Sequence, residues 1–133
     1  MTTQILAALA AFTIARADEA KAPEIVFNGL GAHTRGVATK SKSAQRYFNQ
    51  GLNFLYAFNH DEAVRSFRRA AELDPASPMP WWGVALALGP NIYLDVTPER
   101  DKTAYDAAQR ALTLAASAPA AERAYAKAIS RRY

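Results

Sequence analysis

The chain has 133 residues, of which 50% are hydrophobic, so it holds one small domain with a modest core. Its 16 lysine and arginine residues only slightly exceed its 12 acidic ones and are scattered, apart from a loose group between Arg35 and Arg46. This charge pattern speaks against a nucleic-acid interface, which is denser and more one-sided. The sequence has no cysteine, which excludes disulfides, thiolate nucleophiles and sulfur-ligated metal sites.

The N-terminus carries an apolar run from Ile5 to Ala15, too short to span a bilayer, which takes about 20 residues. The following Ala15-Arg16-Ala17 has the spacing of a secretory cleavage site. We therefore expect residues 1–17 to be a signal peptide, the protein to be periplasmic or secreted, and no stable membrane span. The leader has no lysine or arginine before the apolar run, so a cytoplasmic protein with an apolar first helix stays open as the alternative.

Residues 18–43 contain Pro23 and three glycines but no sustained helical period. This composition predicts an irregular lead-in, and one course open to it is along the first helix.

From Ser41 onward the sequence predicts helix after helix and no strand. Ser41 is expected to cap a first helix that ends near Phe58. The second is expected to run to about Leu73, before Asp74-Pro75, and to begin with a capping box. In that box the Asn59 side chain accepts from the Glu62 amide, and the Glu62 side chain reaches back to the Asn59 amide.

Three more helices are predicted after Pro75. Ser77 is expected to cap the third, with Pro78 at its first position, and Gly89 to end it. Thr97 is expected to cap a fourth that extends to about Ala116. The fifth begins near Pro119 and reaches the end of the chain.

Paired helices with short connections are typical of a repeat of 34 residues. From Ala44 onward, the positions that such a repeat assigns to aromatic, small and proline residues are filled in type by Tyr47, Gly51, Phe54, Ala63, Phe67, Ala70 and Pro75. Small residues let two antiparallel helices approach closely, and the large ones fill the seam between them. The pattern is that of a tetratricopeptide repeat.

The predicted fold is therefore all-α, with antiparallel helical hairpins stacked as a tetratricopeptide-like right-handed α-solenoid of about two repeats plus one extra helix. The expected units are residues 44–77, residues 78–122 with a loop insertion, and residues 123–133 as the first part of an incomplete third unit.

The resemblance extends beyond the repeat pattern. The stretch from Ala44 to Ile92 resembles the first repeats of a family of bacterial tetratricopeptide proteins, often exported and of poorly defined function, and the segment from Ala104 to Tyr133 is similar to the next part of those proteins. The resemblance covers about 100 of the 133 residues. It implies a helical solenoid and, because the family's members are usually several times longer, an N-terminal part of a larger protein.

In such solenoids the first helix of each pair lines the concave surface. The expected partner-binding residues on that surface are apolar or aromatic: Phe48, Leu52, Tyr56, Trp82 and Leu86. The prediction is a protein-interaction scaffold whose groove binds a peptide or partner protein. The alternative is that the lead-in or later helices fill this groove.

Two neighbouring features refine the expected groove. The positions that hold lysine and asparagine in a carboxylate clamp hold Phe48 and Leu52 here, so such a clamp is not expected. Trp81 is predicted to be buried in the seam of its hairpin, while Trp82 turns toward the groove.

The sequence offers little for catalysis. His60, Asp61 and Glu62 are consecutive helical residues that point about 100° apart, so they cannot readily converge on one metal ion. We expect no metal, no cofactor and no enzymatic activity. Two alternatives stay open: that the chain is the N-terminal fragment of a larger protein whose activity lies in other residues, and, less favoured, a metal-dependent enzyme.

Overall fold

The computed structural model describes residues 25–93 and 95–133, and this part of the chain is helical without strands. The predicted signal peptide lies outside the described residues. The elements, in chain order, are α1 (Lys42–Tyr56), α2 (His60–Leu73), α3 (Met79–Leu88), α4 (Pro98–Leu114), a 3-10 turn η1 (Ala115–Ser117) and α5 (Ala120–Ser130). The predicted all-α class is confirmed for the described residues.

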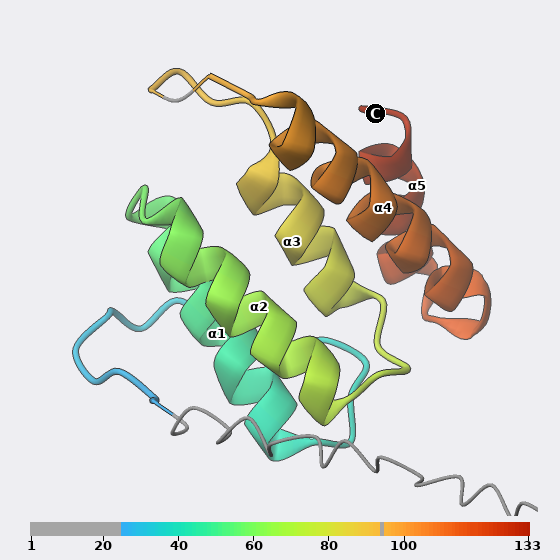
Figure 1. The fold of residues 1–133 in the computed structure, drawn as a ribbon. Coiled ribbons are helices and arrows are strands. Elements are labelled where there is room, and N and C mark those ends of the chain that lie inside the picture. Colours follow the sequence, from blue (N-terminus) through green and yellow to red (C-terminus); the bar gives the residue numbers. More distant parts are fainter. Residues whose placement is uncertain (1–24, 94) are drawn as a thin grey trace, which may run out of the picture.

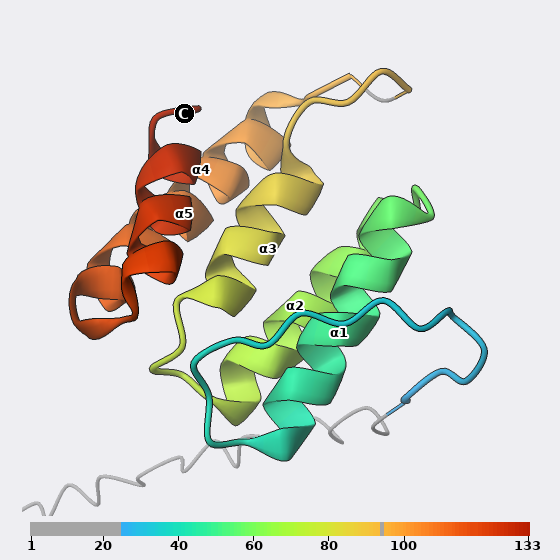
Figure 2. The same ribbon diagram turned by 180° about the vertical axis from the view of Figure 1, so that it is seen from behind.

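The helices lie in two layers, with α3 between the layers. Helices α2 and α4 form the layer nearer the viewer in Figure 1, and α1 and α5 form the layer nearer the viewer in Figure 2. Each helix packs against its neighbour in the chain, and α3 also packs against α1 and α5. Residues 25–40, which we call the strap, pass over α1 on the side shown in Figure 2, and we call this side, formed by α1, α3 and α5, the strap face.

Helix α1 begins as predicted, since the Ser41 hydroxyl accepts a hydrogen bond from the Ala44 amide at 3.1 Å. Its end is closed by Phe58, a non-glycine residue with φ of 60°. The Phe58 amide donates to the Leu55 carbonyl at 3.1 Å, and the Asn59 amide donates to the Phe54 carbonyl at 2.9 Å. These two bonds form the Schellman motif, which satisfies the last carbonyls of the helix.

Helix α2 is capped by only half of the predicted capping box. The Asn59 side chain accepts from the Glu62 amide at 3.4 Å, as expected. The return bond is absent because the Asn59 amide already donates to Phe54 at the end of α1. The Glu62 carboxyl instead pairs with Arg65.

The predicted cap of α3 is wrong. Pro78 occupies the capping position, and no side chain caps this helix. The Ser77 amide donates to the Asp74 carbonyl at 3.2 Å, so Ser77 belongs to the turn after α2, and its buried hydroxyl has no hydrogen-bond partner in the described residues. Gly89 ends α3 as expected.

The last two helices begin as predicted, but α5 ends at Ser130 and does not reach the end of the chain. Thr97 caps α4 by accepting from the Arg100 amide at 3.3 Å, and α4 passes into the 3-10 turn two residues before the expected end. Helix α5 begins directly after Pro119. The chain then returns to α3, where the Tyr133 hydroxyl donates to the Ala85 carbonyl at 2.8 Å.

The centre of the core is the ring of Phe67 on α2, which is fully buried. A Cβ atom on Gly51 of α1 would lie 2.6 Å from this ring, and a Cβ on Gly83 of α3 would lie equally close. The expected contact of a small residue with a large one across the α1–α2 seam is therefore present, and a second one joins α2 to α3. Both glycines are needed because the helices approach so closely that no side-chain atom fits.

Candidate functional site

The strap is held on α1 by the side-chain amide of Gln45. The Gln45 Nε2 atom donates to the Arg35 carbonyl at 2.7 Å, and the Gln45 Oε1 atom accepts from the Val37 amide at 3.0 Å. One side chain thus satisfies both a donor and an acceptor of the strap main chain, as a neighbouring strand would. The residue between, Gly36, takes no part in these bonds.

Two asparagines on the same helix continue this pairing. Asn49 accepts from the Arg35 amide at 3.1 Å, and Asn53 donates to the His33 carbonyl at 2.8 Å. Gln45, Asn49 and Asn53 are spaced by four residues and so share one face of α1. Their partners on the strap are spaced by two residues, which is the period of an extended chain. We call these three residues the amide ladder.

A second amide, Gln50, holds the beginning of the strap. Its Oε1 atom accepts from the Phe27 amide at 2.8 Å, and its Nε2 atom donates to the Ile25 carbonyl at 3.3 Å and to the Ser66 hydroxyl at 3.0 Å. Between the two paired stretches the chain turns through Gly29 and Gly31, whose φ values of 81° and 111° favour glycine.

The far end of the strap reaches α5. The Ala38 amide donates to Glu122 Oε1 at 2.6 Å, and the Arg35 guanidinium lies 4.1 Å from the centre of the Tyr125 ring while its Nη1 donates to the Tyr125 hydroxyl at 3.0 Å. The Tyr125 ring in turn meets the edge of Trp82 at 5.6 Å. Helices α1 and α5 do not pack against each other in the described part of the chain, so on this face the strap links them.

The predicted partner-binding residues are not exposed together on this surface. Phe48 and Leu52 are 0% exposed, and Phe48 packs on the ring of Phe67 at 5.4 Å, so neither offers surface to a partner in this conformation. Tyr56 is 60% exposed and meets the ring of His33 on the strap at 5.1 Å. Trp82 is 8% exposed.

Leu86, the fifth of these residues, is partly buried against the core. The expected open apolar groove is therefore closed, and Phe48 packs on Phe67 of α2. The residues that contact the extended chain are instead the amide side chains of Gln45, Asn49 and Asn53, which are not among the predicted partner-binding residues. The spacing of Asn49 and Asn53 was the available signal.

The prediction for the two tryptophans was wrong for Trp81. This residue is only partly buried and lies on the side of the molecule opposite the strap face, where the Arg110 guanidinium stands 4.7 Å from its ring centre. Trp82, the more buried of the pair, is the one on the strap face. Gly83 has no side chain, and the Phe67 ring lies where its Cβ atom would be, so α3 sits close to α2 at this point.

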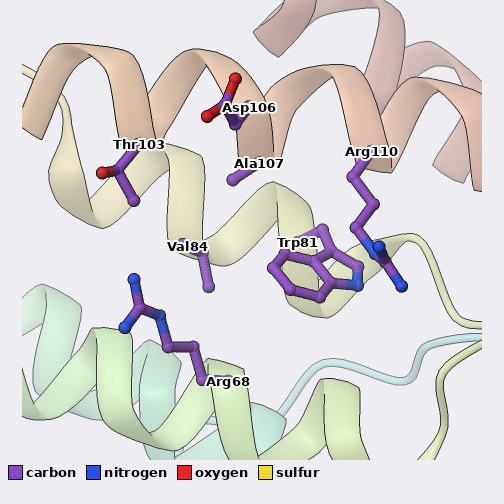
Figure 3. A pocket seen from close by; sticks show the side chains of 7 residues that line it. All are labelled: Arg68, Trp81, Val84, Thr103, Asp106, Ala107 and Arg110. Atoms are coloured by element: carbon purple, nitrogen blue, oxygen red, sulfur yellow. The ribbon is translucent and has the colours of Figure 1, made fainter.

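A cleft of about 340 Å³ opens between α2, α3 and α4 (Figure 3). Its lining residues are Arg68, Trp81, Val84, Thr103, Asp106, Ala107 and Arg110. The Asp106 carboxyl pairs with Lys102 at 2.6 Å, while the guanidinium groups of Arg68 and Arg110 make no ion pair with described residues. The cleft is positively charged over an apolar floor, but nothing in the described chain occupies it.

Two further regions carry conspicuous side chains. Exposed apolar side chains gather where the α1–α2 and α3–α4 loops meet, with the Phe58 and Tyr93 rings 5.4 Å apart. At the start of α2, Asp61 contacts Arg100 at 3.4 Å, and the His60 ring faces Phe58. In the described residues no three histidine or acidic side chains are placed to hold a metal ion.

Comparison with protein-family models, with curated proteins and with solved structures gives no match. Within the described residues, no helix combines the length and the apolar character needed to cross a membrane.

Proposed function

We propose that this chain is a protein-interaction scaffold, a tetratricopeptide-like right-handed α-solenoid segment whose strap face holds an extended polypeptide. The repeat pattern in the sequence and the successive packing of α1 to α5 support the solenoid arrangement. The proposal assigns a binding role and no catalytic one. Its location would be outside the cytoplasm if residues 1–17 direct export.

One observation carries this proposal: all of the hydrogen bonds that the amide ladder makes to the strap go to main-chain atoms. Main-chain groups are the same in every extended segment, so the ladder is suited to a partner as well as to the chain itself. Carboxamides are apt for this role because each offers a donor and an acceptor on one planar group. The strap then occupies the binding surface as a segment of the same chain, and a partner must displace it.

Displacement in trans is opposed by the strap's tethering, because a linked segment has an effective concentration in the millimolar range. The test therefore uses the full chain with the substitution Val37→Pro, since proline has no amide to donate to Gln45. A fluorescently labelled peptide of residues 25–39 is titrated with this variant and with the wild-type chain, and its anisotropy is measured.

We expect the peptide to bind the Val37→Pro chain at least about tenfold more tightly than the wild-type chain, since the occupant in cis is weakened. The same peptide with N-methyl groups on the Arg35 and Val37 amides is the matched control, and it should lose binding because it cannot donate to Asn49 or Gln45. No binding of the unmodified peptide to either chain, or equal binding of the methylated one, would overturn the proposal.

The alternative that the activity belongs to a longer repeat protein stays a prediction. It is compatible with the scaffold proposal, because further repeats would lengthen the same face.

A further inference from the structure

Where the strap meets α5, it presents a side chain as well as its main chain. The Arg35 guanidinium stacks on Tyr125 and bonds its hydroxyl, and Tyr125 is braced edge-on by Trp82. A planar guanidinium suits such a platform better than the compact ammonium of lysine, because it stacks and donates at once. This part of the face therefore distinguishes among side chains, which the amide ladder does not.

An independent observation lies next to this platform. Glu122 is 7% exposed, its Oε1 atom accepts from the Ala38 amide, and its buried Oε2 atom has no hydrogen-bond partner among the described residues. A buried acceptor without a donor costs free energy. The site is thus one donor short when the strap occupies it. A guanidinium has five N–H donors, and in the strap one of them bonds Tyr125.

Gly36 and Val37, which lie between Arg35 and Ala38, set the rest of the pattern. A Cβ atom added at Gly36 would meet nothing within 4 Å, so this position does not require glycine for lack of space. Val37 packs against the core and calls for an apolar residue. The Arg35 and Val37 amides donate to α1, and the Ala38 amide donates to α5. These bonds fix how the segment is aligned with both helices.

From these contacts we propose that the strap face selects partner segments of the form arginine, any residue, apolar residue, with the arginine seated on Tyr125. This inference rests on the proposed function and names the chemistry of the partner. The strap itself carries this pattern as Arg35-Gly36-Val37.

The test uses variants of the labelled peptide of residues 25–39 with the full-length Val37→Pro chain. The peptide variant Arg35→Ala should bind about tenfold more weakly than the unmodified peptide, and Arg35→Lys should fall between them. The variant Gly36→Ala should bind within about twofold, because the added methyl group meets open space.

One substitution in the protein locates the effect. With Tyr125→Ala in the Val37→Pro chain, the unmodified and Arg35→Ala peptides should bind equally, because the platform is lost. Far-UV circular dichroism of each variant confirms that its helices are retained.

Equal binding of the arginine and alanine peptides to the Val37→Pro chain would overturn the inference. If the N-methylated peptide still failed to bind in that case, the scaffold proposal would stand without a side-chain preference. If no peptide bound at all, the scaffold proposal itself would fail.

Discussion

The ring of Phe67 occupies the space in which a Cβ atom on Gly83 would stand, with its Cδ1 atom 2.6 Å from that position. The same ring fills the corresponding space at Gly51. One side chain on α2 thus sets how closely both α1 and α3 approach, and through α3 it sets the position of the aromatic pair that receives Arg35.

Gly83→Ala should destabilise the fold. Alanine is favoured over glycine in a helix by about 1 kcal/mol, but forcing the Phe67 ring to move costs about 1–3 kcal/mol. We expect a net loss of about 1 kcal/mol in the free energy of unfolding, measured by denaturant titration. Gly36→Ala, which meets nothing within 4 Å, is the control. Adding Phe67→Leu to Gly83→Ala should cost less than the sum of the single losses, and strict additivity would contradict the contact.

Phe58→Gly should relieve backbone strain at the end of α1, because φ of 60° disfavours residues with a Cβ by about 1–2 kcal/mol. The contact of Phe58 with Tyr93 partly offsets this gain in the wild-type chain. The comparison is therefore made in a Tyr93→Ala background, where Phe58→Gly should raise the free energy of unfolding by about 1 kcal/mol. A loss of stability in that background would count against the strain.

The substitutions Thr97→Ala and Ser77→Ala should differ in their effect on stability, although each removes a hydroxyl group just before a helix. Thr97 caps α4, so its loss should cost about 1 kcal/mol. The Ser77 hydroxyl is buried without a partner in the described residues, so its removal should leave stability unchanged within about 0.5 kcal/mol or raise it. Thermal unfolding of the two variants measures this difference. An equal loss of stability in both would indicate that Ser77 caps α3 after all.

Gln45→Ala should loosen the strap with little change in the helices. The Val37 amide loses its acceptor, so its hydrogen exchange should become about fivefold faster, corresponding to about 1 kcal/mol for one hydrogen bond. The Ala38 amide, held by Glu122, should change less. Gln109→Ala is the control, since that side chain makes no hydrogen bond within the described residues. Unchanged exchange at Val37, followed by NMR, would show that the ladder does not hold the strap.

Tyr133→Phe should alter the dependence of stability on alkaline pH. Burial, opposed by Arg132, raises the pKa of the Tyr133 hydroxyl above its usual value of 10.0. A raised pKa in the folded state favours folding below the unfolded value and loses that contribution as pH rises through the folded value. The wild-type free energy of unfolding should therefore fall more steeply above about pH 10 than that of Tyr133→Phe. Parallel curves, with Tyr105→Phe as a control for an exposed phenol, would contradict the assignment.

Local signals predicted the helices well. Ser41, Thr97 and, in part, Asn59 act as caps because a cap depends only on residues within one turn. The failures arose where two local motifs compete for one group. The Asn59 amide serves the end of α1 rather than Glu62, and the Ser77 amide serves the turn after α2.

The candidate site was less predictable because it depends on where an irregular segment lies. Helical periodicity placed Phe48 and Leu52 on one face of α1, but it carries no information on what covers that face. The strap's course is set by bonds such as Ala38 to Glu122, which joins residues 84 positions apart. Such a pairing has no counterpart in local sequence patterns.

The amide ladder also limits how long a segment it can hold. Four residues of an α-helix rise about 6.0 Å, whereas two residues of an extended chain advance about 6.6 Å. At each further amide of the ladder, the main-chain group is therefore displaced by about 0.6 Å more along the helix. A hydrogen bond tolerates little more than one such displacement in either direction. Beyond Asn53 the strap leaves the ladder and turns at Gly31. The helix therefore limits an extended bound chain to about five residues before that chain must bend away.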